Sequence, residues 1–281
     1  MFYYIPMKKI NFIVNKNDKI INILTSKGFS YNNANKILRN KDVKINEKRI
    51  KDNTDVYAGD EITIFYNEEM LLGKEIPFIY QDDNIAIVNK PSGIEIEGQD
   101  GLGKILNLIP VHRLDRNTTG LIIFAKNEMA ERQITDAIKN HKITKKYLAQ
   151  VVGSTSFKNY LMKAYLQKNS KESFVKIFNN KVKNSLEIQT IFNTIKSSPS
   201  SSIVECELIT GRTHQIRATL SHLGHPIIGD GKYGKNEDNK KFKQNRQMLH
   251  CYYIKLNGLN KNLAYLNNME FICNPSWYIT N

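Results

Sequence analysis

The sequence predicts an α+β protein in which a small front module precedes a larger domain. Two short helical patterns fill most of residues 18–39, and strand-like runs follow them. From residue 78 onward, short apolar or alternating runs typical of strands outnumber helical patterns. Between these regions, residues 67–74 have the composition of a linker. We therefore expect a front module at residues 1–70 and a main domain at residues 75–281.

The composition limits the possible partners. The chain carries 41 Lys plus Arg against 27 Asp plus Glu, a net charge of +14, and it is 41% hydrophobic, enough for a sizeable core. A balance this basic favours a polyanionic partner, most often nucleic acid, although abundant Lys, Asn and Ile also fit a compositional bias without a partner. No apolar run reaches the roughly 18–20 residues that cross a bilayer, and no leader pattern opens the sequence. We expect a cytoplasmic protein that is a monomer. Its three cysteines are widely spaced, which indicates reduced thiols.

The front module combines helices with basic charge. Helices are expected at residues 18–27, with Asp18 as N-cap, and at 30–39; a strand at 43–50 and a returning strand at 56–64 follow. Residues 16–51 hold ten basic and three acidic side chains, a surplus of seven. Four of the basic side chains are candidate phosphate contacts: Lys36, Arg39, Lys41 and Lys44. The alternative is an ordinary solvated helix face.

The most informative stretch is VHRLDRNTTGL at residues 111–121. It places one carboxylate, Asp115, between the guanidinium groups of Arg113 and Arg116. Asn-Thr-Thr-Gly is turn chemistry, and the apolar run at 121–125 predicts a buried strand. An acid in a tight loop beside a buried strand is both rigid and accessible, which suits catalysis. On local chemistry alone, a surface Arg–Asp–Arg salt bridge explains the pattern equally well.

The segments around this loop predict further elements of the main domain. Residues 78–93 predict two strands that end in a Pro-Ser-Gly turn, and residues 98–103 a flexible approach to the loop. A helix is expected at 128–140, and alternation at 145–153 predicts a strand that carries Tyr147. On the pattern alone, packing in the core is the commoner role of a tyrosine in such a strand. Antiparallel strands are expected after residue 160, with a hairpin tip at 197–202.

A second informative stretch, ITGRTHQIR at residues 209–217, opens a predicted helix. Thr213 is its candidate N-cap and Gly224 its end. His214, His222 and His225 raise the question of a metal site. His225 lies beyond the helix end and no further ligand is evident, so we expect no metal.

Four segments together resemble the RluA-type pseudouridine synthases, which isomerise uridine to pseudouridine in structured RNA. They are NKPSG at 89–93, HRLDRNTTG at 112–120, KKYLAQVVG at 145–153 and ITGRTHQIR at 209–217. The resemblance implies a catalytic domain with a mixed, mostly antiparallel sheet, a cleft across that sheet, and chemistry without cofactor or metal. The front module resembles, more loosely, the small alpha-L-type RNA-binding fold of a small-subunit ribosomal protein and of many rRNA-modifying enzymes.

The resemblance also implies roles for individual residues. Asp115 matches the catalytic aspartate, Arg217 the arginine that pairs with it and keeps it ionised, and Tyr147 the tyrosine that packs on the target uracil. Ile216 matches the apolar residue that lines the base pocket, and Arg113 the arginine that takes the place of the flipped base. Two neighbours in the catalytic loop are further candidate substrate contacts: His112 and Arg116.

Two positions depart from the family pattern. Ile94 to Glu97 stand where the family places a histidine shortly after Gly93, and Thr219 stands where a second histidine is usual. Either change bears on packing or specificity near the site. The Asp115, Tyr147 and Arg217 set is complete.

Within the family, the Gln-Asp-Gly-Leu run at 99–102 and the Leu-Gln-Lys run at 166–168 most resemble the RluC-type enzymes of the large ribosomal subunit, with the RluD type next. The expected partner is therefore structured RNA, in the first place 23S rRNA. A tRNA substrate and a non-catalytic role in ribosome assembly remain alternatives. A carboxylate-based RNA glycosidase would need a second acid beside Asp115, and its loop supplies none.

Overall fold

The computed structural model describes residues 7–29, 31–66, 76–98, 101–169 and 174–278. The chain divides into two compact units, Met1–Ile76 and Pro77–Asn281. The segment expected to link them, residues 67–74, lies outside the described residues. Within the part of the chain that is described, no helix is both long and apolar enough to cross a membrane.

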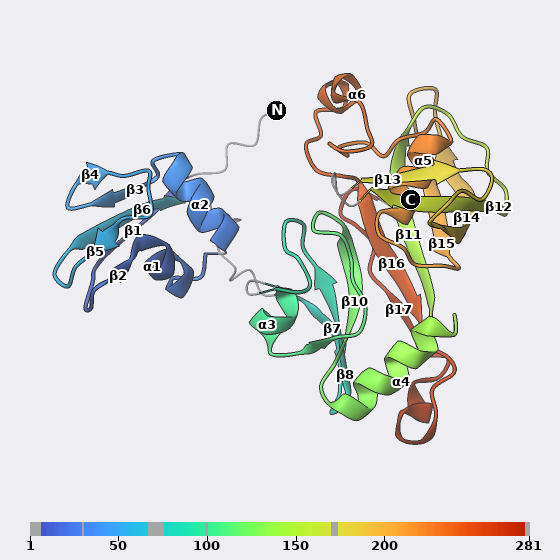
Figure 1. Cartoon of the computed structure of the whole chain (residues 1–281), viewed down its shortest axis with the longest axis horizontal. Coiled ribbons are helices and arrows are strands. Elements are labelled where there is room, and N and C mark those ends of the chain that lie inside the picture. Colours follow the sequence, from blue (N-terminus) through green and yellow to red (C-terminus); the bar gives the residue numbers. More distant parts are fainter. Residues whose placement is uncertain (1–6, 30, 67–75, 99–100, 170–173, 279–281) are drawn as a thin grey trace. The chain divides into compact units, whose positions relative to one another are not determined.

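The first unit is a small α/β module (Figure 1). One sheet has the strand order β1-β6-β3-β4, and a separate ladder joins β2 to β5. Two helices, α1 and α2, follow β2 directly. The bounds are β1 Lys8–Ile13, β2 Asp18–Lys19, α1 Ile20–Ser26, α2 Tyr31–Arg39, β3 Val43–Ile45, β4 Lys48–Arg49, β5 Asp55–Val56 and β6 Glu61–Tyr66.

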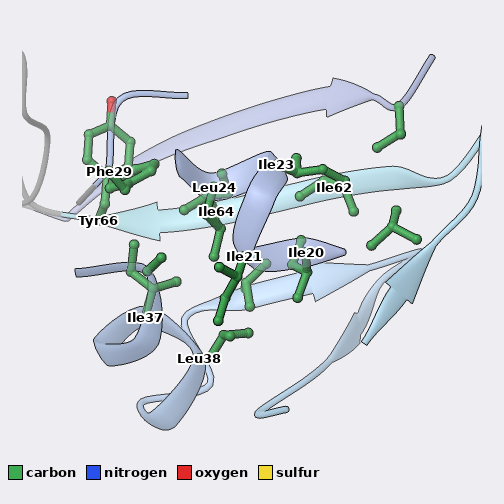
Figure 2. Close-up of a cluster of buried hydrophobic side chains, with 14 residues drawn as sticks. Ile20, Ile21, Ile23, Leu24, Phe29, Ile37, Leu38, Ile62, Ile64 and Tyr66 are labelled. Atoms are coloured by element: carbon green, nitrogen blue, oxygen red, sulfur yellow. The ribbon is translucent and has the colours of Figure 1, made fainter. Parts of the chain in front are cut away.

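This unit has a hydrophobic core of its own (Figure 2). The apolar face of α1 meets Ile37 and Leu38 of α2 and Ile62 and Ile64 of β6. Phe29 and Tyr66 close one end of the core, with ring centroids 5.4 Å apart. The helical periodicity of residues 18–39 thus predicted the buried positions correctly, because each helix has one apolar face to bury.

Two local predictions for this unit were wrong. The expected strand at 43–50 is a tight hairpin, since Asn46 and Glu47 both take positive φ, the conformation of a primed two-residue turn. Asp18 does not cap α1: the N-cap position belongs to Lys19. The Asp18 carboxylate instead accepts hydrogen bonds from the Lys19 and Asn22 nitrogens.

The second unit is built on one mixed sheet of eleven strands among the described residues, which confirms the predicted class. Its main path is β13-β12-β14-β15-β11-β16-β10-β8-β7, while β17 pairs with β16 and β9 with β10. The pairings are antiparallel except that of β10 with β16. The bounds are β7 Phe78–Gln81, β8 Ile85–Lys90, β9 Ile109–Pro110, β10 Thr119–Ala125, β11 Thr144–Val152, β12 Tyr160–Asn169, β13 Phe174–Phe178, β14 Ser185–Ser197, β15 Ser201–Leu208, β16 Leu249–Lys255 and β17 Glu270–Ile272.

Helices lie at the connections of this sheet (Figure 1). They are α3 Leu102–Leu106, α4 Glu128–Lys139, α5 Gln215–His222, α6 Asn236–Lys241 and the 3-10 turn η2 Lys261–Leu266. The predicted α4 is confirmed, capped by the Asn127 side chain, which accepts from the Ala130 amide. Of the flexible approach expected at 98–103, residues 99 and 100 lie outside the described residues. The prediction was wrong for its last two residues, because Leu102 is buried and starts α3.

Candidate active site

The loop at residues 111–118 leaves β9 and returns to β10. Its turn is closed by the Thr118 amide, which donates to the Asp115 carbonyl at 3.0 Å. Midway along β10, the Ile123 amide donates to Nε2 of His112 at 3.0 Å. This strand position lies between the residues that pair with β16 and those that pair with β9, so His112 supplies the acceptor that a neighbouring strand would otherwise provide. Burial lowers the pKa of His112 to about 3, so the ring is neutral and can accept.

A second set of contacts ties the loop to the turn after β8. The Gly93 amide donates to the Arg116 carbonyl at 2.9 Å, and Arg116 Nε donates to the Gly93 carbonyl at 3.1 Å. Lys90 is fully buried, and its ammonium donates to the carbonyls of Pro91 and Arg116, both at 2.9 Å. Burial lowers the pKa of Lys90 to about 7, although the nearby Asp115 charge acts in the opposite direction. The NKPSG segment therefore fixes the backbone beside Asp115.

The predicted contact between Asp115 and Arg217 is present. Arg217, on α5, donates from Nη1 to Oδ2 of Asp115 at 2.8 Å. Its other edge grips Asp230: Nε donates to Oδ2 at 2.7 Å and Nη2 to Oδ1 at 3.0 Å. Such a bidentate pairing uses the planar fork of the guanidinium and fixes its direction. Arg217 is thus held by one carboxylate and presented to another.

Asp230 is a further residue of this site, and the sequence did not predict it. It is 1% exposed, and its carboxylate also accepts from the Lys232 and Tyr233 amides. Burial alone would raise the pKa of Asp230, but the hydrogen bonds and charge of Arg217, with these amides, bring it below its usual value. In the sequence, only the position of Asp230 in the segment that follows α5 could have indicated this role.

Asp115 faces a cavity of about 720 Å³ across the centre of the sheet. Tyr147 of β11 and Ile216 of α5 line the same cavity, and both side chains are at most 5% exposed. Burial raises the pKa of Tyr147 well above its usual value, with the Cys251 thiol as a further cause, so the phenol stays protonated. The cavity volume lies in the range typical of small-ligand sites and offers apolar surface for an aromatic base.

The three other predicted site residues of the loop, Arg113, Arg116 and His112, have different surroundings. Arg113 is exposed and borders both this cavity and a neighbouring one of about 220 Å³. Arg116 borders the smaller cavity, with its Nε already bonded to Gly93. His112 borders the larger cavity, but its Nε2 accepts a hydrogen bond from the Ile123 amide of β10. Substrate contact by these three residues stays a prediction.

The three histidines of the second stretch have separate surroundings. His214 contacts Tyr233, His222 contacts Asn179, and His225 contacts the Val152 carbonyl. Among the described residues, no group of three or more His, Cys, Asp or Glu side chains is arranged to hold a metal ion. Thr213, expected to cap α5, does not do so, since His214 takes the N-cap position and no side chain caps the helix.

Comparison with known proteins agrees with this geometry. The family model described as "RNA pseudouridylate synthase" matches residues 84–222. The "Ribosomal large subunit pseudouridine synthase C" of Buchnera aphidicola is 35% identical over 264 residues, covering 82% of this chain and 82% of that protein. The chain belongs to the RluA-type RNA pseudouridine synthases. It is therefore an isomerase that acts on RNA.

Other relatives place the enzyme within this family. The "tRNA pseudouridine(32) synthase, mitochondrial" of Saccharomyces cerevisiae is 33% identical over 216 residues, which are 71% of this chain but only 46% of the yeast protein. The solved structure titled "Human RNA Pseudouridylate Synthase Domain Containing 1" matches with a TM-score of 0.62 at 25% identity, covering 73% of this chain and 85% of that one. Relatives of this family thus differ in the RNA that their names assign to them.

Proposed function

We propose that the enzyme converts specific uridines of 23S rRNA to pseudouridine, with Asp115 as the catalytic residue. The observation that carries the proposal is the Asp115 carboxylate, held by Arg217 at 2.8 Å at the mouth of a cavity that Tyr147 also lines. The choice of rRNA is supported by the similarity to a large-subunit enzyme along 82% of both chains.

The chemistry requires the base to leave the RNA stack before Asp115 can reach the ribose. Unstacking costs a few kcal/mol, and the contact of the base with Tyr147 is worth about 1–3 kcal/mol. Arg113, exposed at the edge of the cavity, takes the place that the base vacates. The Asp115 carboxylate then either attacks the ribose C1′ or removes the proton from C2′, and the C1′–N1 bond breaks. The uracil rejoins through C5 as Asp115 leaves C1′ or returns the proton to C2′, after which C5 loses its proton and N1 gains one. Arg217 holds in place the carboxylate that both routes use, through the 2.8 Å bond from its Nη1.

The front module provides a second contact with RNA in this proposal. Lys36, Arg39 and Lys41 are exposed around the end of α2. Lys44 differs, because its ammonium forms an ion pair with Glu47 at 2.6 Å. The first three are therefore the stronger candidates for phosphate contacts.

A tRNA substrate is the second candidate, and the similarity to the yeast mitochondrial tRNA enzyme supports it. The deciding experiment is to map pseudouridines in rRNA and tRNA from cells with and without the gene, and to treat unmodified transcripts of both RNAs with the purified protein. Sites in 23S rRNA that disappear without the gene and reappear on the transcript support the proposal. Loss confined to tRNA would replace it with the second candidate.

The matched variant for this assay is Asp115→Asn, which keeps the shape of the side chain and removes its charge. We expect the variant to bind RNA with nearly wild-type affinity and to form no measurable pseudouridine, because both chemical routes need the carboxylate. RNA binding and pseudouridine formation are measured on the same transcript. Turnover near the wild-type rate would contradict the assigned role of Asp115.

A further inference from the structure

His214 enters the active site from an unusual backbone conformation. It stands directly before α5 with φ 57°, in the left-handed region that non-glycine residues seldom occupy. Its half-buried ring lies in the wall shared by the larger cavity and the smaller one beside it. Strained positions of this kind persist where surrounding contacts hold them, and they are concentrated at functional sites.

The contact with Tyr233 favours one tautomer of His214. The Val175 amide donates to the Tyr233 hydroxyl oxygen at 3.1 Å, and the same oxygen lies 2.9 Å from Nδ1 of His214. The Val175 amide takes one acceptor position of the hydroxyl oxygen, and burial raises the pKa of Tyr233, so the hydroxyl keeps a hydrogen that it can donate to Nδ1. This contact favours the tautomer in which Nδ1 accepts and Nε2 carries the hydrogen.

The Tyr233 ring is itself fixed in place. Phe174 stacks on it with ring centroids 4.6 Å apart, and the Arg217 guanidinium carbon lies 5.2 Å from its centroid. The hydroxyl that orients His214 therefore has little freedom to move. The Nε2–H group of His214 is aimed by contacts that reach back to Arg217.

This donor points toward the catalytic carboxylate without bonding to it. Nε2 of His214 is 3.8 Å from Oδ2 of Asp115, too long for a hydrogen bond, and no other described residue bonds to this nitrogen. Burial lowers the pKa of His214; Asp115 and Asp230 oppose this effect, while Arg217 and Lys232 reinforce it. At neutral pH the ring is therefore an uncharged donor at the edge of the cavity.

We propose that Nε2–H of His214 donates a hydrogen bond to a carbonyl oxygen of the target uracil and stabilises the negative charge that this base gains during the reaction. The proposal rests on the role given above to Asp115. When the C1′–N1 bond breaks, its electron pair stays with the uracil, while Asp115 either bonds to C1′ or takes the C2′ proton. The charge spreads over N1 and both carbonyl oxygens. It is neutralised when C5 bonds to C1′, as Asp115 leaves C1′ in the first route or returns the proton to C2′ in the second. C5 then loses its own proton and N1 gains one.

The position of His214 favours the base as its partner. Ile216, two residues further on, and Tyr147 line the larger cavity with apolar surface, which suits the faces of the ring. The carbonyl oxygens lie in the plane of the ring and need a donor at its edge. A fixed neutral donor in a water-poor site, aimed at an atom that becomes negative, lowers the barrier more than the same group in water.

Two substitutions separate the effect of the Nε2 donor from the effect of the rest of the His214 side chain. His214→Asn keeps a polar atom near Nδ1, where it can still contact Tyr233, and asparagine tolerates left-handed backbone. It removes the donor at Nε2. His214→Gln does the reverse, since its amide nitrogen reaches the Nε2 position. The two variants differ in where their amide group lies and carry the same charge.

The assay uses transcripts of 23S rRNA and of tRNA with tritium at uridine C5, because isomerisation releases that hydrogen to water. With enzyme in excess over RNA, we expect His214→Asn to lower the single-turnover rate about 100-fold, the size of effect seen when one such donor is removed. RNA affinity and melting temperature should change little. His214→Gln should stay within about tenfold of wild type, as expected when a donor is restored in imperfect geometry.

A second arm identifies the recipient atom. Replacing the target with 4-thiouridine or 2-thiouridine puts a weaker acceptor, sulfur, in place of one carbonyl oxygen. We expect one of the two thiouridines to lower the rate of the wild type and to leave the rate of His214→Asn unchanged. A wild-type rate for His214→Asn, equal rate decreases in the folded Asn and Gln variants, or no coupling at either thio position would overturn the proposal. Asp115→Asn is assayed in parallel, so its inactivity supports the proposed function whatever the outcome for His214.

Discussion

Arg217 contacts two carboxylates, and these contacts determine which substitutions the site can tolerate. Its Nη1 reaches Asp115, while Nε and Nη2 bind Asp230. Lysine would bring one charge but no planar fork, so it cannot reproduce three directed bonds. We expect Arg217→Lys to lower kcat about tenfold or more and Arg217→Met to abolish activity, since both weaken the electrostatic support of Asp115. Initial rates on a transcript, with the melting temperature as control, test this.

The methionine variant needs a partner substitution, because it leaves Asp230 charged and buried. Removing one member of a buried ion pair costs about 3–5 kcal/mol of unfolding free energy. Adding Asp230→Asn removes the stranded charge and should recover much of that stability. It should not recover activity, because the Arg217 guanidinium that contacts Asp115 is still missing. If the double variant regained wild-type turnover, Arg217 would have only a structural role.

At the scale of single residues, the sequence predicted the contact of Asp115 with Arg217 but not that of Arg217 with Asp230. The pair was found through the family resemblance, since 102 residues separate its two members. Asp230 has no local pattern that distinguishes it from any other aspartate in a turn. Its role follows from burial and from the bidentate contact, which depend on tertiary structure.

At the scale of elements, the junction of β10 with β16 depends on Gly120. Gly120 pairs with Cys251 in the parallel ladder and has φ 107°. An added Cβ would overlap the Cys251 backbone, so Gly120→Ala must strain the backbone and displace β16. We expect the loss in unfolding free energy to exceed the about 1–2 kcal/mol that left-handed backbone alone costs an alanine, because the clash adds to that strain. Denaturant unfolding measures it.

Gly224→Ala is the matched control for this prediction. Gly224 also has positive φ, 84°, but an added Cβ would meet nothing within 4 Å. It should therefore cost only the conformational strain, about 1–2 kcal/mol. If both variants lost the same stability, the close approach of β10 to β16 would not matter.

The elements that the sequence predicted well are those with a periodic apolar pattern, such as α4 and β11. The elements it missed are short and determined by distant contacts. Leu102 starts the five-residue helix α3 because its side chain is buried, not because of any repeating pattern. His214 replaces Thr213 at the start of α5, and the contact of its ring with Tyr233, 19 residues away, holds that conformation. Local propensity cannot encode contacts of this range.

A buried histidine on β16 links the stability of this sheet to pH. His250 is 3% exposed, with Nε2 at 2.8 Å from the Cys273 carbonyl and Nδ1 at 2.7 Å from the Thr119 hydroxyl. Burial lowers its pKa to about 4 from 6.5. The unfolded chain therefore binds a proton below pH 6.5 that the folded chain binds only near pH 4. Unfolding free energy should fall with acidification in that window, by at most about 1.4 kcal/mol per pH unit for this group.

The test compares wild type with His250→Gln by urea unfolding at several pH values between 7.5 and 4.5. The variant cannot titrate at this position, so its stability should fall less steeply over that range, even if it is lower at pH 7.5. His112, whose pKa burial also lowers, adds the same dependence to both proteins and so cancels in the comparison. Parallel curves for the two proteins would exclude a contribution from His250.

At the scale of the whole molecule, RNA binding should depend on both units, since each contributes a different kind of contact. The second unit holds the cavity that we propose receives the target nucleotide, and the first carries exposed basic side chains around the end of α2. Contacts with phosphates release counterions and so make affinity depend on salt, whereas contacts with a base depend on salt much less. The two contributions can therefore be separated in the intact protein.

We expect the triple variant Lys36→Ala, Arg39→Ala, Lys41→Ala to bind RNA less tightly and with a weaker salt dependence. Each phosphate that the variant no longer neutralises should lower the slope of log affinity against log salt by about 0.9 on duplex-like RNA. The matched control is Lys19→Ala in the same unit, because the Lys19 ammonium is already paired with Asp55 at 2.7 Å. Affinities are measured on one transcript across a salt series. The triple variant should keep its single-turnover rate at saturating enzyme, because none of these residues lies in the unit that holds Asp115. A slope equal to that of the control would mean that the end of α2 does not bind RNA phosphates.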